Sequence, residues 1–228
     1  MTVARLLPPA ALAAALLARR RWRNWGAEPG EVAERMPGEE LLAGTSTSVT
    51  RAVTIEADAE DVWPWLVQIG QGRGGMYSYD WLENLLGLDI HSSNRIHPEH
   101  QHLAVGDRIT LVHEGWMGGP GYSLPVAAVD PGRSFVLRQQ PPEHPWDAVW
   151  TFVVRDLGPG RCRLISRSTS VRPPGIPGVV AAVMGEVMDP ITLMMTRRML
   201  VGIKDRAEGH RGDVVTLAPV ERVPDAVG

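Results

Sequence analysis

The strongest constraint on the fold is a run of short alternating segments between residues 108 and 171, separated by turn sequences. Two of the turns read Asp130-Pro131-Gly132 and Gly158-Pro159-Gly160, and both are typical of hairpins. The segments expected as strands are Arg108–His113, Tyr122–Val129, Ser134–Gln139, Ala148–Arg155 and Cys162–Val171. This run predicts an antiparallel meander of at least five strands.

One long helix is expected after the meander. Residues 178–208 place apolar side chains at helical spacing, and Asp189-Pro190 is expected to break or re-cap the helix because proline lacks a backbone N–H. A curved sheet has one face to bury, and this helix is the only element large enough to cover it. The sequence therefore predicts an α+β helix-grip fold, in which a curved antiparallel sheet wraps around a long C-terminal helix.

A strand and a helix are expected at the start of the folded region. Residues 49–55 alternate as a strand, with Val49, Val53 and Ile55 on one face. Asp58 is expected to cap a helix, because apolar residues recur after it at helical spacing. These residues are Val62, Trp65, Leu66 and Ile69. A second short helix is expected over 79–86, so two short helices follow the first strand.

A glycine motif lies between these two helices. Gly70, Gly72 and Gly75 match G-x-G-x-x-G, which in a dinucleotide-binding fold follows a strand. Here the preceding residues have helical spacing, and no alternation of strands and helices follows. The interpretation favoured is a tight turn between helices, in which glycine supplies positive φ. No dinucleotide or other cofactor is expected.

Composition and charge narrow the class of protein. Of the 228 residues, 44% are apolar and 21% charged, which excludes a wholly disordered chain. The single cysteine, Cys162, excludes an intrachain disulfide and a cysteine-cluster metal site. Residues 1–25 hold five arginines and no acid, whereas the rest of the chain holds 18 basic and 26 acidic residues. This acidic body argues against nucleic acid as a partner.

The chain divides into four parts. Residues 1–25 contain thirteen apolar residues, Leu6–Ala18, followed by arginines, whereas a membrane-spanning helix needs about 20. This segment is a candidate membrane-associated helix, with an anchor, a surface helix and a loose extension as alternatives. Residues 26–48 are expected as a linker lying over the domain, 49–210 as the domain and 211–228 as a weakly ordered tail. The expected location is cytoplasmic, with membrane association through the N-terminus as the alternative.

Several motifs resemble the START/Bet v1-like superfamily of polyketide cyclase/dehydrase and lipid-transport proteins, and most closely a bacterial branch of it. They are VWPWL at 62–66, QGRGG at 71–75, YSYDWLEN at 77–84, PEHQHLAVGD at 98–107 and IKDRAE at 203–208. The resemblance covers residues 48–210. It implies a helix-grip fold with an apolar cavity between sheet and C-terminal helix. It leaves the activity open, because members include carriers, cyclases, dehydratases and hormone receptors.

Eight residues are candidate ligand contacts in such a cavity. Guanidinium groups can hold a carboxylate, tyrosine and aspartate can orient a carbonyl or hydroxyl, and tryptophan offers apolar surface. The candidates are Arg73, Tyr77, Tyr79, Asp80, Trp116, Arg138, Trp150 and Arg167. Strand 162–171 carries small residues on one face and two arginines on the other, and the alternation leaves open which face lines the cavity.

Five histidines fall between residues 91 and 113, which raises the question of a metal site. The spacing of His97, His100 and His102 matches no recognised metal-binding arrangement. A solvated loop is therefore the favoured interpretation, and no metal is expected.

Two functions of different class fit these residues. The first is binding or transport of a hydrophobic small molecule, such as a lipid, isoprenoid or polyketide. The second is a cyclase or dehydratase that acts on a polyketide-like substrate by general acid/base catalysis, with His91, Asp89 and Asp80 as candidate groups. Binding is favoured because no recognised catalytic motif is present. The sequence assigns neither a ligand nor an oligomeric state.

Overall fold

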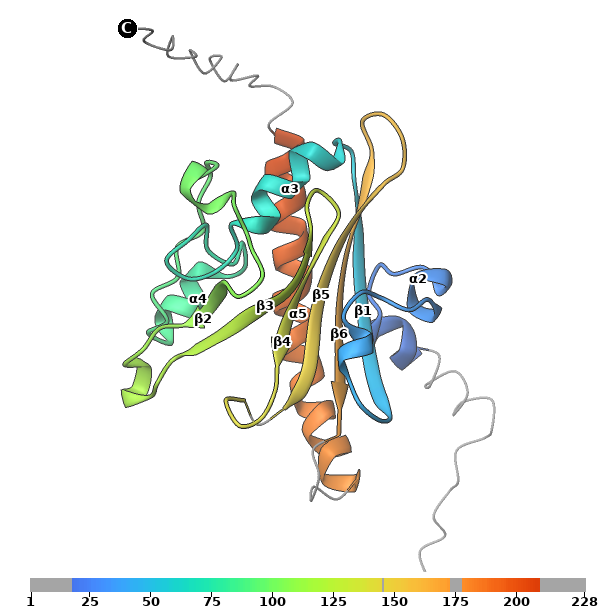
Figure 1. Cartoon of the computed structure of the whole chain (residues 1–228), viewed down its shortest axis with the longest axis vertical. Helices are drawn as coiled ribbons and strands as arrows, with labels where there is room; N and C mark the ends of the chain where they lie inside the picture. The colour runs from blue at the N-terminus through green and yellow to red at the C-terminus, as the bar shows by residue number, and fades with distance from the viewer. Residues whose placement is uncertain (1–17, 145, 173–177, 210–228) are drawn as a thin grey trace, which may run out of the picture.

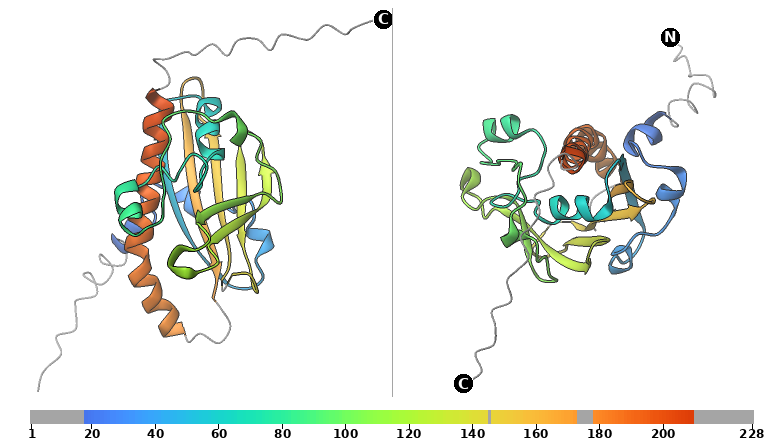
Figure 2. Two further views of the ribbon diagram at one scale, coloured as in Figure 1. Left: turned by 90° about the vertical axis from the view of Figure 1, so that its left-hand side faces the viewer. Right: turned by 90° about the horizontal axis from the view of Figure 1, so that it is seen from above.

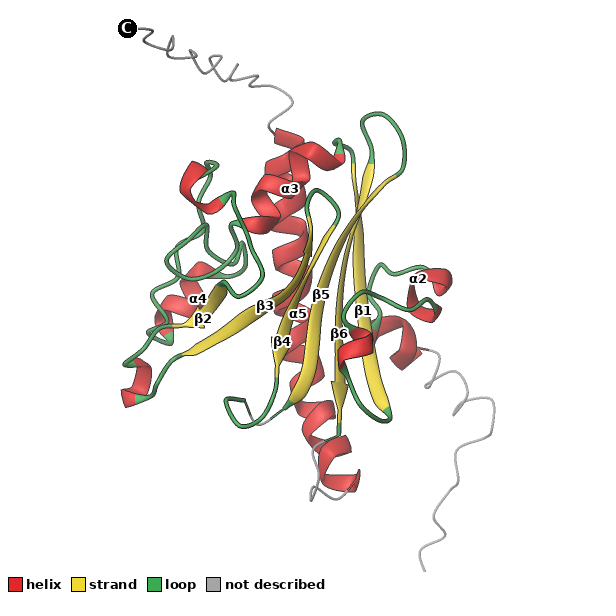
Figure 3. Ribbon diagram, in the orientation of Figure 1, coloured by secondary structure: helices red, strands yellow, loops and turns green. Residues whose placement is uncertain are grey.

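The computed structural model describes residues 18–144, 146–172 and 178–209 of the chain. Six antiparallel strands form one sheet in the order β1-β6-β5-β4-β3-β2 (Figures 1 and 3). The strands are β1 (Ser46–Ile55), β2 (Arg108–Val112), β3 (Tyr122–Asp130), β4 (Ser134–Gln139), β5 (Asp147–Asp156) and β6 (Cys162–Val171). The β3–β4 register shifts between Val126 and Ala128, and such a bulge bends a sheet locally.

One long helix runs along one face of this sheet, as the turned views show (Figure 2). The helices are α2 (Pro29–Ala33), α3 (Ala59–Val67), α4 (Asp80–Leu85) and α5 (Gly178–Gly209), with 3-10 turns η1 (Glu39–Leu41), η2 (Pro98–His100) and η3 (Trp116–Gly118). The predicted α+β helix-grip fold is confirmed, including the two short helices after the first strand.

The ends of the chain are described only in part. Residues 18–23 are helical, whereas most of the apolar segment predicted within 1–25 and the whole tail predicted at 211–228 lie outside the described residues. Among the helices of the described part, none combines the length and apolar character that crossing a membrane requires.

The expected break at Asp189-Pro190 does not occur, because α5 continues through Pro190. A proline inside a helix removes one backbone hydrogen bond. Contacts with other elements hold the helix at this point. Arg23 Nε lies 2.7 Å from Asp189 Oδ2, and Arg51 Nη1 of β1 donates to the Thr192 carbonyl at 3.0 Å. These contacts offset the lost bond.

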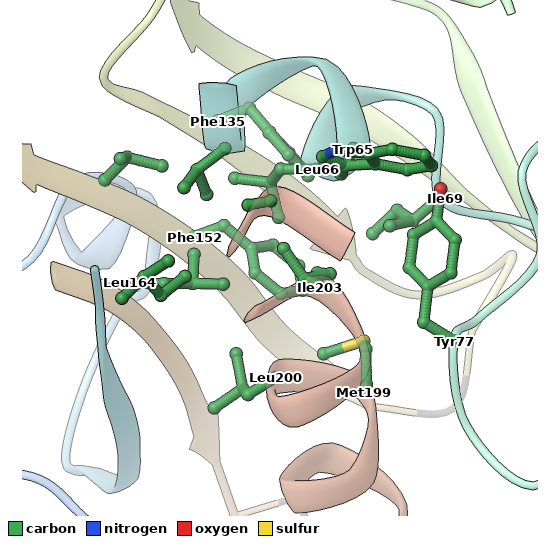
Figure 4. Packing of buried hydrophobic residues seen from close by; sticks show 14 of the residues in the cluster. Trp65, Leu66, Ile69, Tyr77, Phe135, Phe152, Leu164, Met199, Leu200 and Ile203 are labelled. Atoms are coloured by element: carbon green, nitrogen blue, oxygen red, sulfur yellow. The ribbon is translucent and has the colours of Figure 1, made fainter. Parts of the chain in front are cut away.

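The core lies between the sheet, α3 and the C-terminal half of α5 (Figure 4). The helical spacing predicted for α3 places Trp65 and Leu66 inside, where they are at most 1% exposed. They pack with Phe152 of β5 and with Leu200 and Ile203 of α5. Side chains therefore fill the space between sheet and helix at this end of the molecule.

Residues 26–45, expected as part of a linker, cover the other face of the sheet. Glu31 of α2 accepts two hydrogen bonds from Arg163 of β6, at 2.7 and 2.8 Å. Thr151 of β5 donates to the Pro37 carbonyl at 2.8 Å. The N-terminal segment therefore covers the face of β5 and β6 that points away from α5.

Gly202 marks the closest approach of α5 to the chain before α4. A Cβ atom there would lie 2.3 Å from the Tyr77 carbonyl oxygen. We expect Gly202→Ala to lower the free energy of unfolding by about 1–3 kcal/mol. Gly185→Ala on the same helix is the control, because its Cβ meets no atom of the described residues within 4 Å. That variant should gain about 0.5–1 kcal/mol from helix propensity. Urea unfolding measures both, and equal responses would contradict the close approach.

Candidate functional site

Strand β6 shows which face of the sheet meets α5. Cys162 and Leu164 belong to the core beneath α5, and Ser166 follows them on the same side. Arg163 and Arg167 alternate with these residues and therefore lie on the opposite face. The small residues of β6, and not its arginines, line the space between sheet and helix.

Arg138 and Arg167 were predicted as ligand contacts, but the structure places both outside that space. Arg167 Nε donates to Thr50 Oγ1 at 2.9 Å, and its Nη1 lies 3.2 Å from Glu39 Oε1. Arg138 Nη2 donates to the Leu41 carbonyl at 3.2 Å. Both guanidiniums hold the N-terminal segment on the outer face. For Arg138 the alternative was a cross-strand ion pair, and its Nη2 lies 2.5 Å from Asp147 Oδ1 of β5. The partners of Arg167 were not predictable because residues 26–48 were expected to be a linker.

The helix-facing side of the sheet is open to solvent at the end away from α3. Ser168 of β6 is exposed although it lies on this side, and Thr192 of α5, which bonds to β1 on the same side, is also exposed. Trp150 of β5 is half-buried, packs on Phe152 at a ring distance of 4.8 Å and donates from Nε1 to Ser166 Oγ at 2.9 Å. We take this open end as the candidate site, and Trp150 is the predicted contact that it contains.

Arg51 of β1 is the charged group of this side, and it is 5% exposed. It stands opposite Ser166 in the β1–β6 register. Its Nη1 donates to Thr196 Oγ1 at 3.0 Å in addition to the Thr192 carbonyl. Burial lowers the pKa of Arg51 to about 10, with Asp189 opposing and Arg23 adding to the effect.

Charge around Arg51 is not balanced by its neighbours. In the described part of the chain no carboxylate lies within ion-pair distance of it, and its buried Nε has no partner there. The nearby Asp189 pairs with Arg23 at 2.7 Å. Two guanidiniums therefore share one carboxylate, although a buried arginine is normally paired.

Two aromatic residues flank the same end of the sheet. Tyr122 begins β3 and packs on the core, and the imidazole of His144 lies edge-on to its ring at 4.9 Å. His144 is 4% exposed, and its Nε2 has no hydrogen-bond partner among the described residues. Burial raises the pKa of the Tyr122 hydroxyl. The sequence analysis did not select either residue.

The predicted contacts before and on α4 have structural partners. Tyr77 is 1% exposed, and its hydroxyl accepts a 2.7 Å hydrogen bond from Gln68 Nε2. Burial raises its pKa to about 12. Asp80 accepts hydrogen bonds from the Ser92 backbone and hydroxyl at 2.7 and 2.6 Å. Tyr79 is the N-cap of α4. These contacts attach α4 to the core, and Tyr77 offers no surface to a ligand.

The remaining candidates lie on loops beside β2. Trp116 donates from Nε1 to the Leu86 carbonyl at 2.7 Å. Arg73 donates to the Val67 carbonyl at 3.0 Å and lines an open cleft of about 460 Å³ with Asp89 and His91. The cleft is lined by residues of the glycine turn, of the loop after α4 and of 110–114, and neither Trp116 nor Trp150 is among them.

The acid/base set proposed for the enzyme alternative does not converge on one point. His91 Nε2 lies 3.0 Å from Asp89 Oδ1, and their side chains are 76% and 78% exposed. Asp80 is bound to Ser92 instead. These three groups therefore offer no enclosed pair of titratable side chains.

The glycine motif forms a turn, and the histidines from 91 to 102 lie in the loop region between α4 and β2. Gly70, Gly72 and Gly75 all have positive φ in a turn that follows α3, as the sequence analysis favoured over a dinucleotide site. His97 Nε2 lies 2.8 Å from Ser93 Oγ in a loop. Among the described residues, no group of three or more His, Cys, Asp or Glu is arranged to hold a metal ion.

Comparison with known proteins finds similarity only among solved structures. No family model and no curated protein matches the sequence. A Thalictrum flavum norcoclaurine synthase structure is 13% identical, with a TM-score of 0.44, and the match covers 75% of this chain and 99% of that one. The structure of an aromatase/cyclase from Streptomyces sp. R1128 is 18% identical, with a TM-score of 0.41, and the match covers 73% of this chain and 96% of that one. A Mesorhizobium loti protein structure is 20% identical, with a TM-score of 0.39, and the match covers 72% of this chain and 98% of that one. The fold assignment rests on the chain's own sheet order and helix.

Proposed function

We propose that the protein binds a hydrophobic small molecule at the open end of the helix-facing side, around Trp150. The observation that carries the proposal is the contrast along this side of the sheet. Near α3 it is packed solid, whereas at Ser168 and Trp150 it stays accessible to solvent. An aromatic side chain held half-exposed by a hydrogen bond to Ser166 offers a ready apolar contact.

The ligand class follows from Arg51. A buried guanidinium that has no carboxylate of its own among the described side chains favours a ligand with a negatively charged or strongly accepting group. Thr192 of α5 is exposed at the same end and bonds to Arg51, so a ligand there would lie between the helix and the sheet. We therefore propose an amphipathic ligand, with its apolar body on Trp150 and its acidic group toward Arg51.

Arg51→Met tests the acidic end of the ligand. With a medium-chain fatty acid as probe, we expect the dissociation constant to rise by about tenfold or more, because a hydrogen bond to a charged group contributes about 1.5–3 kcal/mol. The alcohol of the same chain length should bind both proteins equally. If the variant weakened acid and alcohol alike, Arg51 would only hold α5 in place.

Ser168→Trp tests the place of binding. A large side chain at this exposed position should fill the open end and abolish binding of both probes, as measured by quenching of tryptophan fluorescence or by calorimetry. Arg155→Trp, on the outer face of β5, is the matched control and should bind normally. Normal binding by Ser168→Trp would place the ligand elsewhere and overturn the proposal.

A cyclase or dehydratase remains the second candidate, supported by His144. An imidazole is a common general base, and this one lies against Tyr122 with a ring nitrogen that has no hydrogen-bond partner among the described residues. If a polyketide-like ligand is released from the purified protein on organic extraction, its turnover should be lost in His144→Gln. Binding without turnover would leave the carrier function alone.

A further inference from the structure

The side of α5 that faces away from the sheet forms a distinct face of the molecule. In the two turned views, α4, α5 and the helical residues 18–23 line the same side, opposite the outer face of the sheet (Figure 2). We call these three elements the helical face. Its residues come from parts of the chain far apart in sequence, so its composition is not a consequence of one local segment.

The short helix α4 places its apolar side chains outward on this face. Trp81 is 68% exposed and Leu85 is 75% exposed, and they are four residues apart on one side of the helix. Leu86, directly after them, is 58% exposed. Glu83, an acid, is instead 3% exposed. This reverses the usual pattern of a surface helix, in which the charged side chain faces water.

Helix α5 continues the apolar surface. Val187, Ile191 and Met194 follow a helical spacing of four and three residues and are 62%, 50% and 41% exposed. Leu200 and Ile203 on the other side of the same helix are fully buried. The helix therefore has an apolar side toward the sheet and a second apolar side toward the exterior.

Positive charge lies at the edge of the helical face. Arg19, Arg20 and Arg21 are exposed in residues 18–23. Arg19 and Arg20 line a cleft of about 290 Å³ together with Arg23. Trp22 in the same helix is 42% exposed. Exposed arginine beside tryptophan and aliphatic side chains is the composition of a helix that lies at a membrane interface.

We propose that the helical face docks onto an anionic lipid surface. The apolar side chains of α4 and α5 would insert among the acyl chains near the headgroups, and the exposed Arg19, Arg20 and Arg21 would bind the phosphates. A lipid surface is favoured over a second copy because it offers acyl chains to the apolar side chains and phosphates to the edge arginines in the same contact. The inference does not depend on the ligand proposed for the other side of α5.

Cosedimentation of the full chain with vesicles tests this inference. The vesicles are of phosphatidylcholine, with or without phosphatidylserine. We expect binding to the phosphatidylserine vesicles, weakening as salt is added. The variant Trp81→Ser/Leu85→Ser/Ile191→Ser should lose about tenfold or more in affinity, because it removes most of the inserted apolar surface. Leu157→Ser, a 49% exposed leucine in the β5–β6 turn, is the matched control and should bind as the unchanged protein does.

Two outcomes would overturn the inference. Unchanged binding by the triple variant would show that residues 1–25 attach the chain without α4 and α5. Absence of vesicle binding, together with a dimer that the triple variant converts to a monomer in light scattering, would make the helical face a contact between copies. The substituted side chains are exposed, so circular dichroism should show the same fold in every variant.

Discussion

Replacing Arg163 with methionine is expected to lower the free energy of unfolding by about 3–5 kcal/mol, because it leaves the Glu31 carboxylate buried without its cation. The two residues are 7% and 5% exposed, and two hydrogen bonds join them. Burial alone would raise the pKa of Glu31, but the hydrogen bonds from Arg163 and the Glu28 backbone outweigh it and lower the pKa. Urea unfolding near neutral pH measures the loss.

The double variant separates the ion pair from the packing around it. Glu31→Leu combined with Arg163→Met removes both charges, so it should recover most of the stability that each single change loses. Arg155→Ala is the surface control, because its pair with Glu34 at 2.7 Å is 43% and 36% exposed. That change should cost less than about 1 kcal/mol.

The pH dependence gives the same pair a second test. The Glu31 pKa is lower in the folded protein than its ordinary value of 4.5. The pair therefore stabilises the fold fully above pH 4.5, and this contribution is lost as pH falls through the lowered pKa. The difference between the unchanged protein and Arg163→Met should shrink in that acid range. A difference that is small at neutral pH and constant with pH would show that residues 26–45 are not held by this pair.

The same ion pair shows where prediction from the sequence reaches its limit. Strands of the meander were predictable because alternation and turn residues are local signals, and β4 and β6 have the predicted bounds. The partner of β6's outer face was not predictable in this way. Arg163 and Arg167 are bound by residues more than a hundred positions earlier, so their alternation indicated two faces but not what covered each.

Arg51 was missed although the sequence held a signal for it. The strand prediction placed Val49, Val53 and Ile55 on one face, and Arg51 alternates in step with them. A charged residue in the middle of an apolar strand face is a candidate for a buried functional group. What the sequence could not supply was the identity of its partners, because Thr192 and Thr196 lie on an element that only the folded chain brings near.

Replacing Glu83 with glutamine is expected to stabilise the protein at alkaline pH. Glu83 of α4 is 3% exposed, and its buried Oε2 has no hydrogen-bond partner among the described residues. Burial, together with the charge of Asp80, raises its pKa from 4.5 to about 7, although a hydrogen bond with Ser78 opposes the shift. The folded protein thus holds this proton more tightly than the unfolded chain does.

The sign of the effect follows from linkage. Stability from the protonated Glu83 is fully present below pH 4.5 and is lost as pH rises through about 7. Glu83→Gln keeps the neutral side chain at every pH, so its free energy of unfolding should exceed that of the unchanged protein by about 3 kcal/mol at pH 8 and match it at pH 4. Urea unfolding at several pH values measures the two curves.

Exposed Glu60 of α3 provides the control, since Glu60→Gln should leave the pH dependence as it is. Parallel curves for Glu83→Gln and the unchanged protein would mean that water or a cation reaches Glu83.

Because Trp81 and Leu85 face outward from the same short helix, a charged Glu83 should weaken the packing of α4 first. The hydrogen-exchange rate of the α4 amides should therefore rise between pH 6 and 8 by more than the intrinsic pH dependence of exchange. In Glu83→Gln the rate should rise only by the intrinsic amount.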